Sequence, residues 1–337
     1  MDTPYPFINL STSVISGFSP EVREKLLFDH TTRNNIMWCT DNYAFLGAGF
    51  QARDSITVDN ITSKYPNLIL PRALKSKDTQ RDRTRDMAEV FTPSWICNKQ
   101  NNLIDSAWFG REDVFNIEID NADIAHSWMP TSGKIEFPEG KTWQDYVTDI
   151  RLEITCGEAP YLVSRYDAVS GAPLPVEMRI GLLDRKLRVV GENTATSGQW
   201  LAAAKAALRA IYAYEWQGDN LLIARTNILH TILDFYRARF GRTIPARSLP
   251  GFAYIISWNI WQMDGLKGVI PDTCGERRAI IRTLFGETEI VKHCDGCNNC
   301  NIREHNGTYA LIADWPADTA SSQVKHKKTI RFIDLFK

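Results

Sequence analysis

The residues best suited to chemistry lie at the ends of three apolar, strand-like runs. The first run contains Glu153 and ends in Cys156-Gly157. The second run ends in Glu215 and the third in Asp264. The carboxyl ends of parallel strands meet at one edge of a sheet, where ligands bind. A glycine lets backbone N–H groups approach a ligand, and acids accept hydrogen bonds from ribose hydroxyls or an adenine amino group. The sequence therefore predicts a ligand crevice at this edge.

A second group of candidate ligands lies in the segment HCDGCNNCNIREH near the end of the chain. Its C-x2-C-x2-C spacing, with a histidine on each side, suits tetrahedral coordination of Zn²⁺ by soft thiolates. Free surface thiols in a turn and an iron–sulfur cluster are the alternatives. The predicted metal ligands are Cys274, Cys294, Cys297 and Cys300, with His293 and His305 as alternatives.

Two basic segments could contact the phosphates of DNA. Residues 72–86, RALKSKDTQRDRTRD, mix cations with aspartates, and KHKK lies close to the end of the chain. Clustered cations can neutralise phosphates, although a solvated loop or helix face is the alternative for the first segment and a structural tail for the second. The candidate DNA-contacting residues are Arg81, Arg83, Arg85, Lys325, Lys327 and Lys328.

The elements that must position the crevice residues follow an α/β alternation from residue 151 onward. The β-prone run RLEIT leads through the glycine turn into a helix-compatible run, APYLVSRYD. Helical and strand patterns then alternate: QWLAAAKAALRA, IYAYEW, a long helix that ends at Gly241, SLPGFAYIIS and WNIWQM. This order predicts an α/β fold with a doubly wound, mostly parallel, Rossmann-like sheet. Residues 167–198 interrupt the order and are expected to be an insertion with a turn and one basic amphipathic segment.

Four regions are expected along the chain. Phe91-Thr92-Pro93 ends one helical pattern, and Thr92 or Ser94 is placed to cap the next helix, whose start can meet a carboxylate. The regions are an irregular N-terminal region (1–105), a connecting subregion (106–150), an α/β domain (151–270) and a small Cys-rich C-terminal region (271–337).

Composition limits the classes of protein to consider. The 337 residues are 44% hydrophobic and 23% charged, with a net charge of −1, so any nucleic-acid surface must be a local patch. No apolar run reaches the roughly 18 residues of a membrane helix, and no signal peptide is expected. Seven cysteines, several of them isolated in apolar surroundings, indicate a reducing, cytoplasmic location with buried thiols.

An ordered set of four motifs resembles the amino-terminal half of the adenine-N6 DNA methyltransferases. The family's G[EQ]FYTP-like motif corresponds to AEVFTP, and its DPACGSG motif to EITCGEA. An acid after the second strand and an Asp at the third correspond to YAYEWQGDNLLIARTNIL and QMDGL. The resemblance covers roughly residues 85–270 and extends to the modification subunits of bacterial restriction–modification systems.

The resemblance implies a site for S-adenosylmethionine in a methyltransferase fold. Phe91, Thr92 and Pro93 would flank the methionine part of the cofactor, and Glu153, Cys156 and Gly157 would form the glycine-turn site. Glu215 would hold the ribose, and Asp264, with Trp216 or Met263 beside it, would face the adenine. Helix or turn caps are the alternative for the last two acids, and a core aromatic is the alternative for Phe91. DNA and a restriction or specificity subunit are the implied partners.

Departures from the family pattern bear on catalysis. The glycine motif has lost its proline, and its last glycine is Ala159, which right-handed helical or β geometry would tolerate. The chain contains no Pro-Pro pair, so the catalytic [DNS]PP[YFW] motif is missing; Asp314-Trp315-Pro316 is the nearest replacement. The sequence therefore predicts a DNA methyltransferase-like subunit, which methylates adenine N6 if it is active. The alternative is a catalytically silent methyltransferase fold that serves as a DNA-binding or scaffold subunit.

A nuclease is the third hypothesis. Asp120, followed by Glu139-Gly140-Lys141, fits a loose D…ExK pattern in which acids hold Mg²⁺ and a lysine stabilises developing charge. Pro138 stands where a strand would be needed, which disfavours this interpretation.

Overall fold

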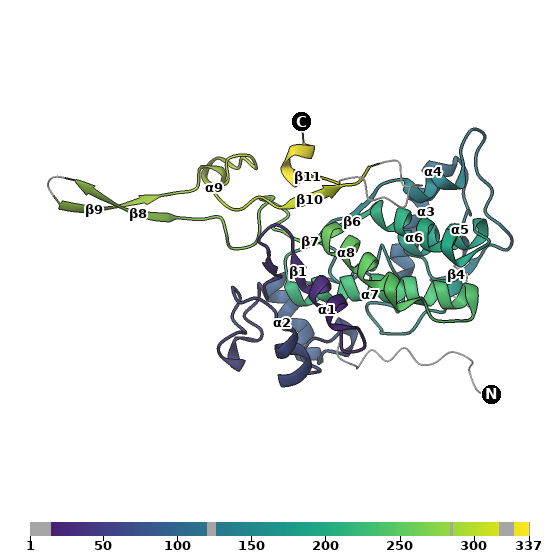
Figure 1. Ribbon diagram of the computed structural model, residues 1–337, viewed down its shortest axis with the longest axis horizontal. Helices are drawn as coiled ribbons and strands as arrows, with labels where there is room; N and C mark the ends of the chain where they lie inside the picture. The colour runs from purple at the N-terminus through teal and green to yellow at the C-terminus, as the bar shows by residue number, and fades with distance from the viewer. Residues whose placement is uncertain (1–14, 120–125, 284–285, 317–326, 337) are drawn as a thin grey trace.

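The computed structural model describes residues 15–119, 126–283, 286–316 and 327–336. Its helices are α1 Pro20–Leu27, α2 Lys77–Met87, α3 Ser94–Phe109, α4 Trp143–Thr148, α5 Leu182–Asn193, α6 Ser197–Arg209, α7 Gly218–Phe240, α8 Leu249–Asn259 and α9 Asp295–Asn299. Its strands are β1 Phe28–Asp29, β2 Asn34–Asn35, β3 Asn116–Ile119, β4 Ser127–Pro130, β5 Arg151–Glu153, β6 Ile211–Glu215, β7 Ile260–Gln262, β8 Arg277–Thr283, β9 Gly286–Lys292, β10 Leu311–Asp314 and β11 Lys328–Arg331. Figure 1 shows a helical body from which the ribbon of β8 and β9 projects.

The central sheet joins β5, β6 and β7. Within the described residues these three strands are parallel and lie in chain order, with Arg151 opposite Ile211 and Ala213 opposite Ile260. Helices α5 and α6 connect the first pair of strands, and α7 and α8 connect the second. The predicted helices and strands from residue 197 to residue 262 are thereby confirmed.

The two faces of the sheet are covered differently. Ile211, Ala213 and Ile260 belong to the main apolar core, which also contains buried residues of α1 and α5–α8. Tyr214 and Trp261 belong to a second core with residues of β10 and the segment after β11. Helices thus cover one face, and an antiparallel strand pair with its flanking turns covers the other. The fold is mixed α/β with a small parallel sheet, and the predicted doubly wound arrangement is not confirmed.

The helix predicted after the glycine turn is absent. The run APYLVSRYD forms turns rather than a helix, and Ala159 adopts φ +64°, a left-handed conformation that interrupts helix geometry. The next helix is α5, which lies in the expected insertion and packs Leu183, Leu187 and Val190 into the core without exposure. The basic amphipathic segment expected in this insertion corresponds to α5, whose apolar side belongs to the main core.

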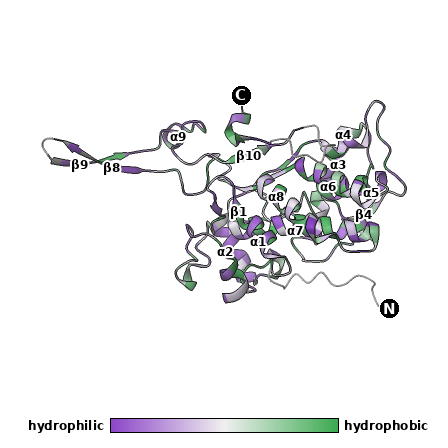
Figure 2. Cartoon of the chain, viewed as in Figure 1, coloured by the Kyte–Doolittle hydropathy of each residue, from purple (hydrophilic) through white to green (hydrophobic). Residues whose placement is uncertain are grey.

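The regions before and after the sheet contain antiparallel pairs. In the expected connecting subregion, β3 and β4 pair and α4 packs on α5. In the tail, β8 and β9 form the projecting ribbon, along which Figure 2 shows both hydrophilic and hydrophobic residues. No helix among the described residues is long and apolar enough to cross a membrane.

Candidate functional site

A cleft of about 1090 Å³ lies at the carboxyl ends of β5 and β6. The segment after α2 and a loop near the N-terminus form its other walls. The volume suits a ligand of nucleoside size or larger. Lining residues include Cys39, Asp41, Arg85, Asp86, Glu89, Phe91, Thr92, Glu153, Cys156, Gly157, Tyr161, Glu215, Trp216, Gln217 and Asp272. Most residues of the predicted cofactor site are therefore brought together here.

Glu153 ends β5, and its side chain is almost fully buried. Its two carboxylate oxygens accept hydrogen bonds from the backbone N–H groups of Tyr161 (3.3 Å) and Leu162 (3.2 Å). Burial raises the pKa of Glu153 to about 8, and the charge of Glu215 acts in the same direction. The carboxyl group is therefore mostly protonated at neutral pH and would ionise more readily beside a bound cation.

Glu215 ends β6 and fixes the glycine turn. Its Oε2 accepts from the N–H of Gly157 at 2.8 Å, and its Oε1 accepts from the N–H of Gln217 at 3.0 Å. Burial raises the pKa of this carboxyl group, while these backbone bonds act against the rise. A carboxylate oxygen has more than one lone pair, so Glu215 can still accept from a ligand hydroxyl in the cleft.

The FTP segment packs directly on the glycine turn. Gly157 adopts φ +53°, and a Cβ at this position would lie 3.2 Å from the Phe91 ring. The guanidinium carbon of Arg72 lies over the Phe91 ring, 5.4 Å from its centroid. The backbone of Ala159, which replaces the last glycine of the motif, is left-handed (φ +64°) and has neither the right-handed nor the β geometry that would tolerate this replacement. A side chain in place of Gly157 would therefore crowd the Phe91 ring and be strained at this φ, which favours glycine at this wall of the cleft.

The start of α3 is capped by a distant residue. Pro93 is the cap position, and neither Thr92 nor Ser94 supplies the predicted side-chain cap. Instead, the Ser94 N–H donates to Asp167 Oδ2 at 2.7 Å. The helix start does meet a carboxylate, as expected, but the carboxylate belongs to the chain itself.

A buried ion-pair network holds the FTP segment against α7. Arg83 is 2% exposed and lies 2.6 Å from Glu89 and 2.8 Å from Asp219. Tyr43 also donates to Asp219, at 2.7 Å. Burial alone would raise the pKa of Asp219, but the charges of Arg83 and Lys75 hold it well below the usual range. Arg83 was predicted to contact DNA; the structure gives it a positioning role instead.

Several cleft residues were not predicted from the sequence. Gln217 and Asp41 lie in the wall, and Asp272 reaches the cleft from the segment after β7. The predicted Asp264 does not line the cleft, because its Oδ1 accepts from the N–H groups of Leu266 (2.9 Å) and Lys267 (3.2 Å) in its own turn. The strand-end position and the QMDGL motif predicted Asp264 in the cofactor site, but its hydrogen bonds match the alternative prediction, a turn cap.

Trp216, by contrast, does line the cleft. Its side chain is half-buried, and its Nε1 donates to the backbone carbonyl of Cys39 at 3.2 Å. This bond ties the ring to the N-terminal loop and leaves part of the indole exposed in the cleft. A fixed, partly exposed aromatic ring can stack on a flat ligand.

Acids dominate the charge of the cleft. Among the described residues that line it, Arg85 is the one arginine or lysine, and it pairs with Asp86. The lining acids are Asp41, Asp86, Glu89, Glu153, Glu215 and Asp272. Because Asp86 and Glu89 pair with arginines and Glu153 is mostly protonated at neutral pH, the excess of acids rests on Asp41, Glu215 and Asp272. This excess favours a cationic ligand and opposes a phosphorylated one.

The predicted catalytic replacement lies elsewhere. Asp314 ends β10 opposite Lys328 in the strand pair, and neither Asp314 nor Trp315 lines the cleft. Trp315 donates from Nε1 to Asn259 Oδ1 at 2.7 Å and packs against the main core. The structure therefore assigns Asp314-Trp315 no place beside the predicted cofactor site.

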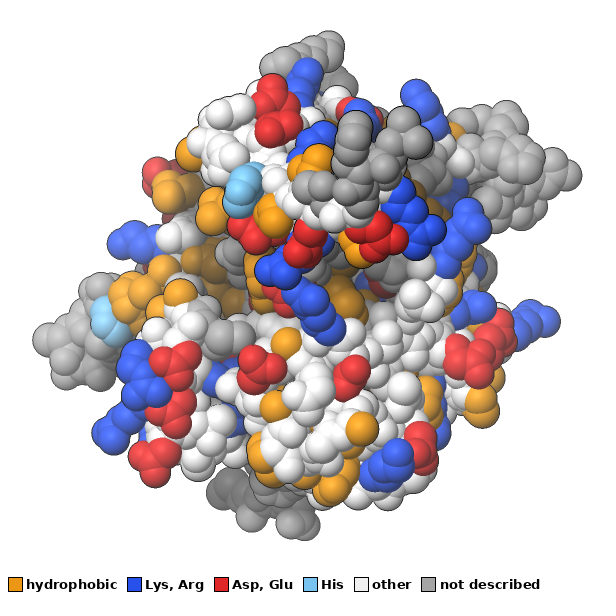
Figure 3. Space-filling view, turned by 90° about the vertical axis from the view of Figure 1, so that its left-hand side faces the viewer, with side chains coloured by type: hydrophobic (Ala, Val, Ile, Leu, Met, Phe, Trp, Pro, Cys, Tyr) orange, Lys and Arg blue, Asp and Glu red, His pale blue; other side chains and the backbone are white. Residues whose placement is uncertain are grey.

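The remaining basic candidates occupy varied environments. Arg81 and Arg85 are exposed on α2 and pair with Asp78 and Asp82. Lys327 stacks over the Trp258 ring at 3.4 Å, Lys328 is exposed, and Lys325 lies outside the described residues. Figure 3, which views the side from which the ribbon projects, shows basic and acidic side chains intermingled.

The described residues of the D…ExK pattern do not form a recognisable nuclease site. Asp120 lies outside the described residues, and Glu139 is exposed. Lys141 donates to the backbone carbonyl of Trp108 at 2.9 Å and lies 4.2 Å from the centroid of its ring.

A Cys3His cluster that can hold a metal ion lies at the base of the ribbon. The ligand atoms of Cys274, Cys294, Cys297 and His305 all lie within 4.8 Å of one another. Cys274 Sγ is 3.2 Å from Cys294 Sγ and 3.4 Å from Cys297 Sγ, and His305 Nδ1 is 3.3–3.7 Å from the three sulfurs. Tetrahedral Zn²⁺ places neighbouring ligand atoms roughly 3.5–3.8 Å apart, so the donor set fits this ion.

Two predicted ligands do not join this cluster. Cys300 is exposed, with φ +52°, at the end of α9, and the cluster does not include it. His293 Nδ1 lies 2.9 Å from Glu276 Oε1. His305, an alternative in the sequence prediction, takes the fourth position instead, because the chain turns back after α9 and brings it beside Cys274.

Comparison with known proteins adds no assignment: no protein-family model, curated protein or solved structure shows significant similarity to this chain.

Proposed function

We propose that the cleft binds S-adenosylmethionine and that the chain is a DNA methyltransferase-like subunit of a restriction–modification system. The observation that carries this proposal is the meeting of three separate motifs around one acidic cleft. Phe91 of FTP packs on Gly157, Glu215 binds the N–H of the same glycine, and Trp216 follows it in the wall.

The chemistry of the cleft matches the charges of this cofactor. S-adenosylmethionine carries a sulfonium, an ammonium and a carboxylate group, hence a net positive charge, and no phosphate, which suits a cleft with more acids than bases. Glu215 would accept hydrogen bonds from the ribose hydroxyls, and the Trp216 ring would pack on the adenine. Glu153 would attract the ammonium group, while Phe91 and Thr92 would flank the methionine part.

A catalytically silent DNA-binding or scaffold subunit is the second candidate. It is favoured by the position of Asp314 and Trp315, which lie outside the cleft, and by the missing Pro-Pro pair. A chain of this kind would bind the cofactor without transferring its methyl group. Incubation with methyl-labelled cofactor and DNA separates the candidates: label in adenine supports the first, and binding without transfer supports the second.

Calorimetric titration with S-adenosylmethionine tests the cofactor proposal. We expect micromolar binding by the wild-type chain, at least tenfold weaker binding by Glu215→Gln, and loss of binding by Glu215→Ala. Asp78→Asn is the matched control, because this acid is exposed on α2 and does not line the cleft. No binding by the folded wild-type chain would reject the proposal.

The affinity should depend on pH through Glu153. A cation prefers the ionised carboxylate, and with a pKa of about 8 the ionised fraction grows as pH rises from 6 to 8. The ratio of wild-type to Glu153→Gln affinity should therefore increase by up to about tenfold per pH unit over this range. Ionisation of the ligand affects both proteins equally, so it cancels in the ratio of the two affinities. A ratio that stays constant would show that Glu153 does not face the cation.

We further propose that the Cys3His cluster binds Zn²⁺ in a structural role. Cys274 precedes β8, and Cys294 and Cys297 follow β9, so a shared ion would fasten both strands at the base of the ribbon. Four protein ligands leave no open position for a catalytic water, which favours a structural site.

A further inference from the structure

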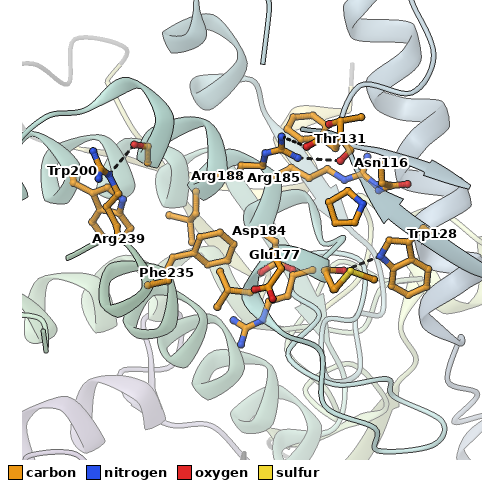
Figure 4. Close-up of a pocket in the computed structure, with 18 residues that line it drawn as sticks. Asn116, Trp128, Thr131, Glu177, Asp184, Arg185, Arg188, Trp200, Phe235 and Arg239 are labelled. Carbon is orange, nitrogen blue, oxygen red and sulfur yellow. Dashed lines mark hydrogen bonds between the residues drawn. The ribbon is translucent and has the colours of Figure 1, made fainter. Parts of the chain in front are cut away.

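The helical side of the body contains a second cavity, of about 370 Å³, between β3–β4 and helices α5 and α7. Its wall includes Arg185 and Arg188 (Figure 4). Arg185 pairs with Asp105 at 2.6 Å, and Arg188 donates to the backbone carbonyls of Phe115 (3.0 Å) and Thr131 (2.8 Å). The chain itself satisfies these charges, so they call for no ligand. The central sheet, by contrast, ends in backbone groups that the chain leaves unpaired.

The two edges of the central sheet differ. At β7, the Gln262 side chain accepts from the Met37 N–H at 2.9 Å and donates to the Met37 carbonyl at 2.8 Å. A loop from the N-terminal region therefore covers this edge. At β5, no described strand pairs with the outer side. A strand edge of this kind presents N–H and C=O groups that can pair with another chain.

Leu152, at the centre of β5, directs its backbone groups outward. The preceding residue, Arg151, donates its N–H to the carbonyl of Ala210, next to β6, at 2.9 Å. Successive residues of a strand direct their N–H and C=O groups to opposite sides, so those of Leu152 point away from β6. No hydrogen bond from another described residue reaches them.

The exposed side chains on this edge are apolar. Ile150, Leu152 and Ile154 alternate along the chain, so they lie on one face, and they are 69%, 47% and 62% exposed. Ile150 and Leu152 also line a groove of about 140 Å³ with Tyr212 and Leu335. The pair β10–β11 covers this face over β6 and β7 but leaves these side chains of β5 open. Edge strands are usually shielded by charged residues or proline, and this row has neither.

We propose that the β5 edge is the interface with a second copy of the chain, in which the two β5 strands pair antiparallel about a two-fold axis at Leu152. The N–H of Leu152 donates to the carbonyl of the partner's Leu152, and the reverse bond forms by symmetry. The two three-stranded sheets become one continuous sheet. An interface of this kind uses the same patch on both copies and is closed, so it does not lead to fibres.

The register favours a second copy over an unrelated strand, because the edge is complementary to itself. With the axis at Leu152, Ile150 lies beside the partner's Ile154, so the apolar rows of both copies meet along their whole length. On the opposite face, Arg151 lies opposite the partner's Glu153, and no like charges are paired. Pairing also joins the two grooves and covers the exposed apolar side chains of both.

This interface adjoins the acidic cleft. Glu153, Ile154 and Thr155 line the cleft, so the pairing brings the partner's Ile150 to its rim beside Ile154. The two clefts of the dimer therefore lie on either side of the axis. The proposal does not depend on which ligand the cleft binds.

Sedimentation velocity of the purified chain tests the proposal. The buffer contains a reductant, because Cys297 and Cys300 are exposed and could otherwise link two chains through a disulfide. We expect a concentration-dependent dimer that predominates at about 100 μM, since the interface is small. Monomers alone at this concentration would overturn the proposal.

Two substitutions of Leu152 test the side chain and the backbone separately. Leu152→Lys places like charges at the axis and should weaken the dimer at least tenfold. Leu152→Pro removes the outward N–H, which a strand edge tolerates, so the monomer should fold while the dimer weakens at least tenfold. Circular dichroism checks the fold of each variant.

Each substitution has a matched control. Leu266→Lys changes a leucine that is 89% exposed in the turn after β7, and Leu152→Val keeps both the N–H and an apolar side chain. Both controls should retain the dimer. A dimer that persists in folded Leu152→Lys and Leu152→Pro, or that Leu266→Lys weakens equally, would show a different interface and overturn the proposal.

Hydrogen exchange tests the same interface without any substitution. The peptide that contains Leu152 should exchange more slowly at a concentration where dimers predominate than at one where monomers do, because its outward N–H becomes bonded. Equal exchange of this peptide at both concentrations would contradict the β5 pairing.

Discussion

Replacing Arg83 with methionine is expected to lower the free energy of unfolding by about 3–5 kcal/mol. The substitution leaves the carboxylates of Glu89 and Asp219 buried without their main cation. Loss of one partner of a buried ion pair is costly because the other charge stays desolvated. Urea denaturation followed by circular dichroism measures the effect.

Arg81→Met is the matched control for this experiment. Arg81 lies on the same helix, its side chain is 82% exposed, and its ion pair with Asp78 spans 3.9 Å. We expect a change within about 0.5 kcal/mol. Equal effects of the two substitutions would contradict the positioning role of Arg83. The lowered pKa of Asp219 also makes the stability of the wild type depend on pH. The ionised carboxylate stabilises the fold above about pH 4, and this contribution decreases as the pH falls below that value.

The Cys294→Ser variant is expected to lose its metal ion, while Cys300→Ser retains it. Cys294 Sγ lies within the Cys3His cluster, whereas Cys300 is exposed and outside it. Elemental analysis of the purified chains should give about one zinc per chain for the wild type and Cys300→Ser, and close to none for Cys294→Ser.

The effect of metal loss should be confined to the tail. The proposed ion would fasten the base of the ribbon, and the main core does not include its ligands. Proteolysis of Cys294→Ser should therefore cut near the ribbon and leave the helical body intact. Zinc lost equally from both variants would show that Cys300 belongs to the site, and zinc absent from the wild type would reject the metal site.

Strong local periodicity made part of the fold predictable. The alternation from α6 through β7 follows directly from the sequence because each element has a buried apolar face. The same reasoning failed around residues 158–167, where the left-handed Ala159 prevents a helix. It also gave no sign that Asp184, Arg185 and Lys186 of α5 are buried, because charged residues are usually exposed.

The sequence indicated which residues line the cleft better than it indicated which residues pair with one another. Glu153, Gly157 and Glu215 lie in the cleft as expected, because strand ends position them. The burial of Arg83 could not be read from a run of mixed charge, since its partner Asp219 is distant in the chain. The choice of His305 over Cys300 likewise depends on how the chain turns after α9.

Photochemical crosslinking of methyl-labelled S-adenosylmethionine, followed by peptide mapping, shows whether the cofactor binds in the acidic cleft. If it does, label will appear in the peptides that contain Phe91 or Trp216, and unlabelled cofactor will compete for this labelling. Labelling should be greatly reduced in Glu215→Ala and unchanged in Asp78→Asn. Competed label confined to a peptide outside the cleft, or no competed label in the folded wild-type chain, would contradict binding in the cleft.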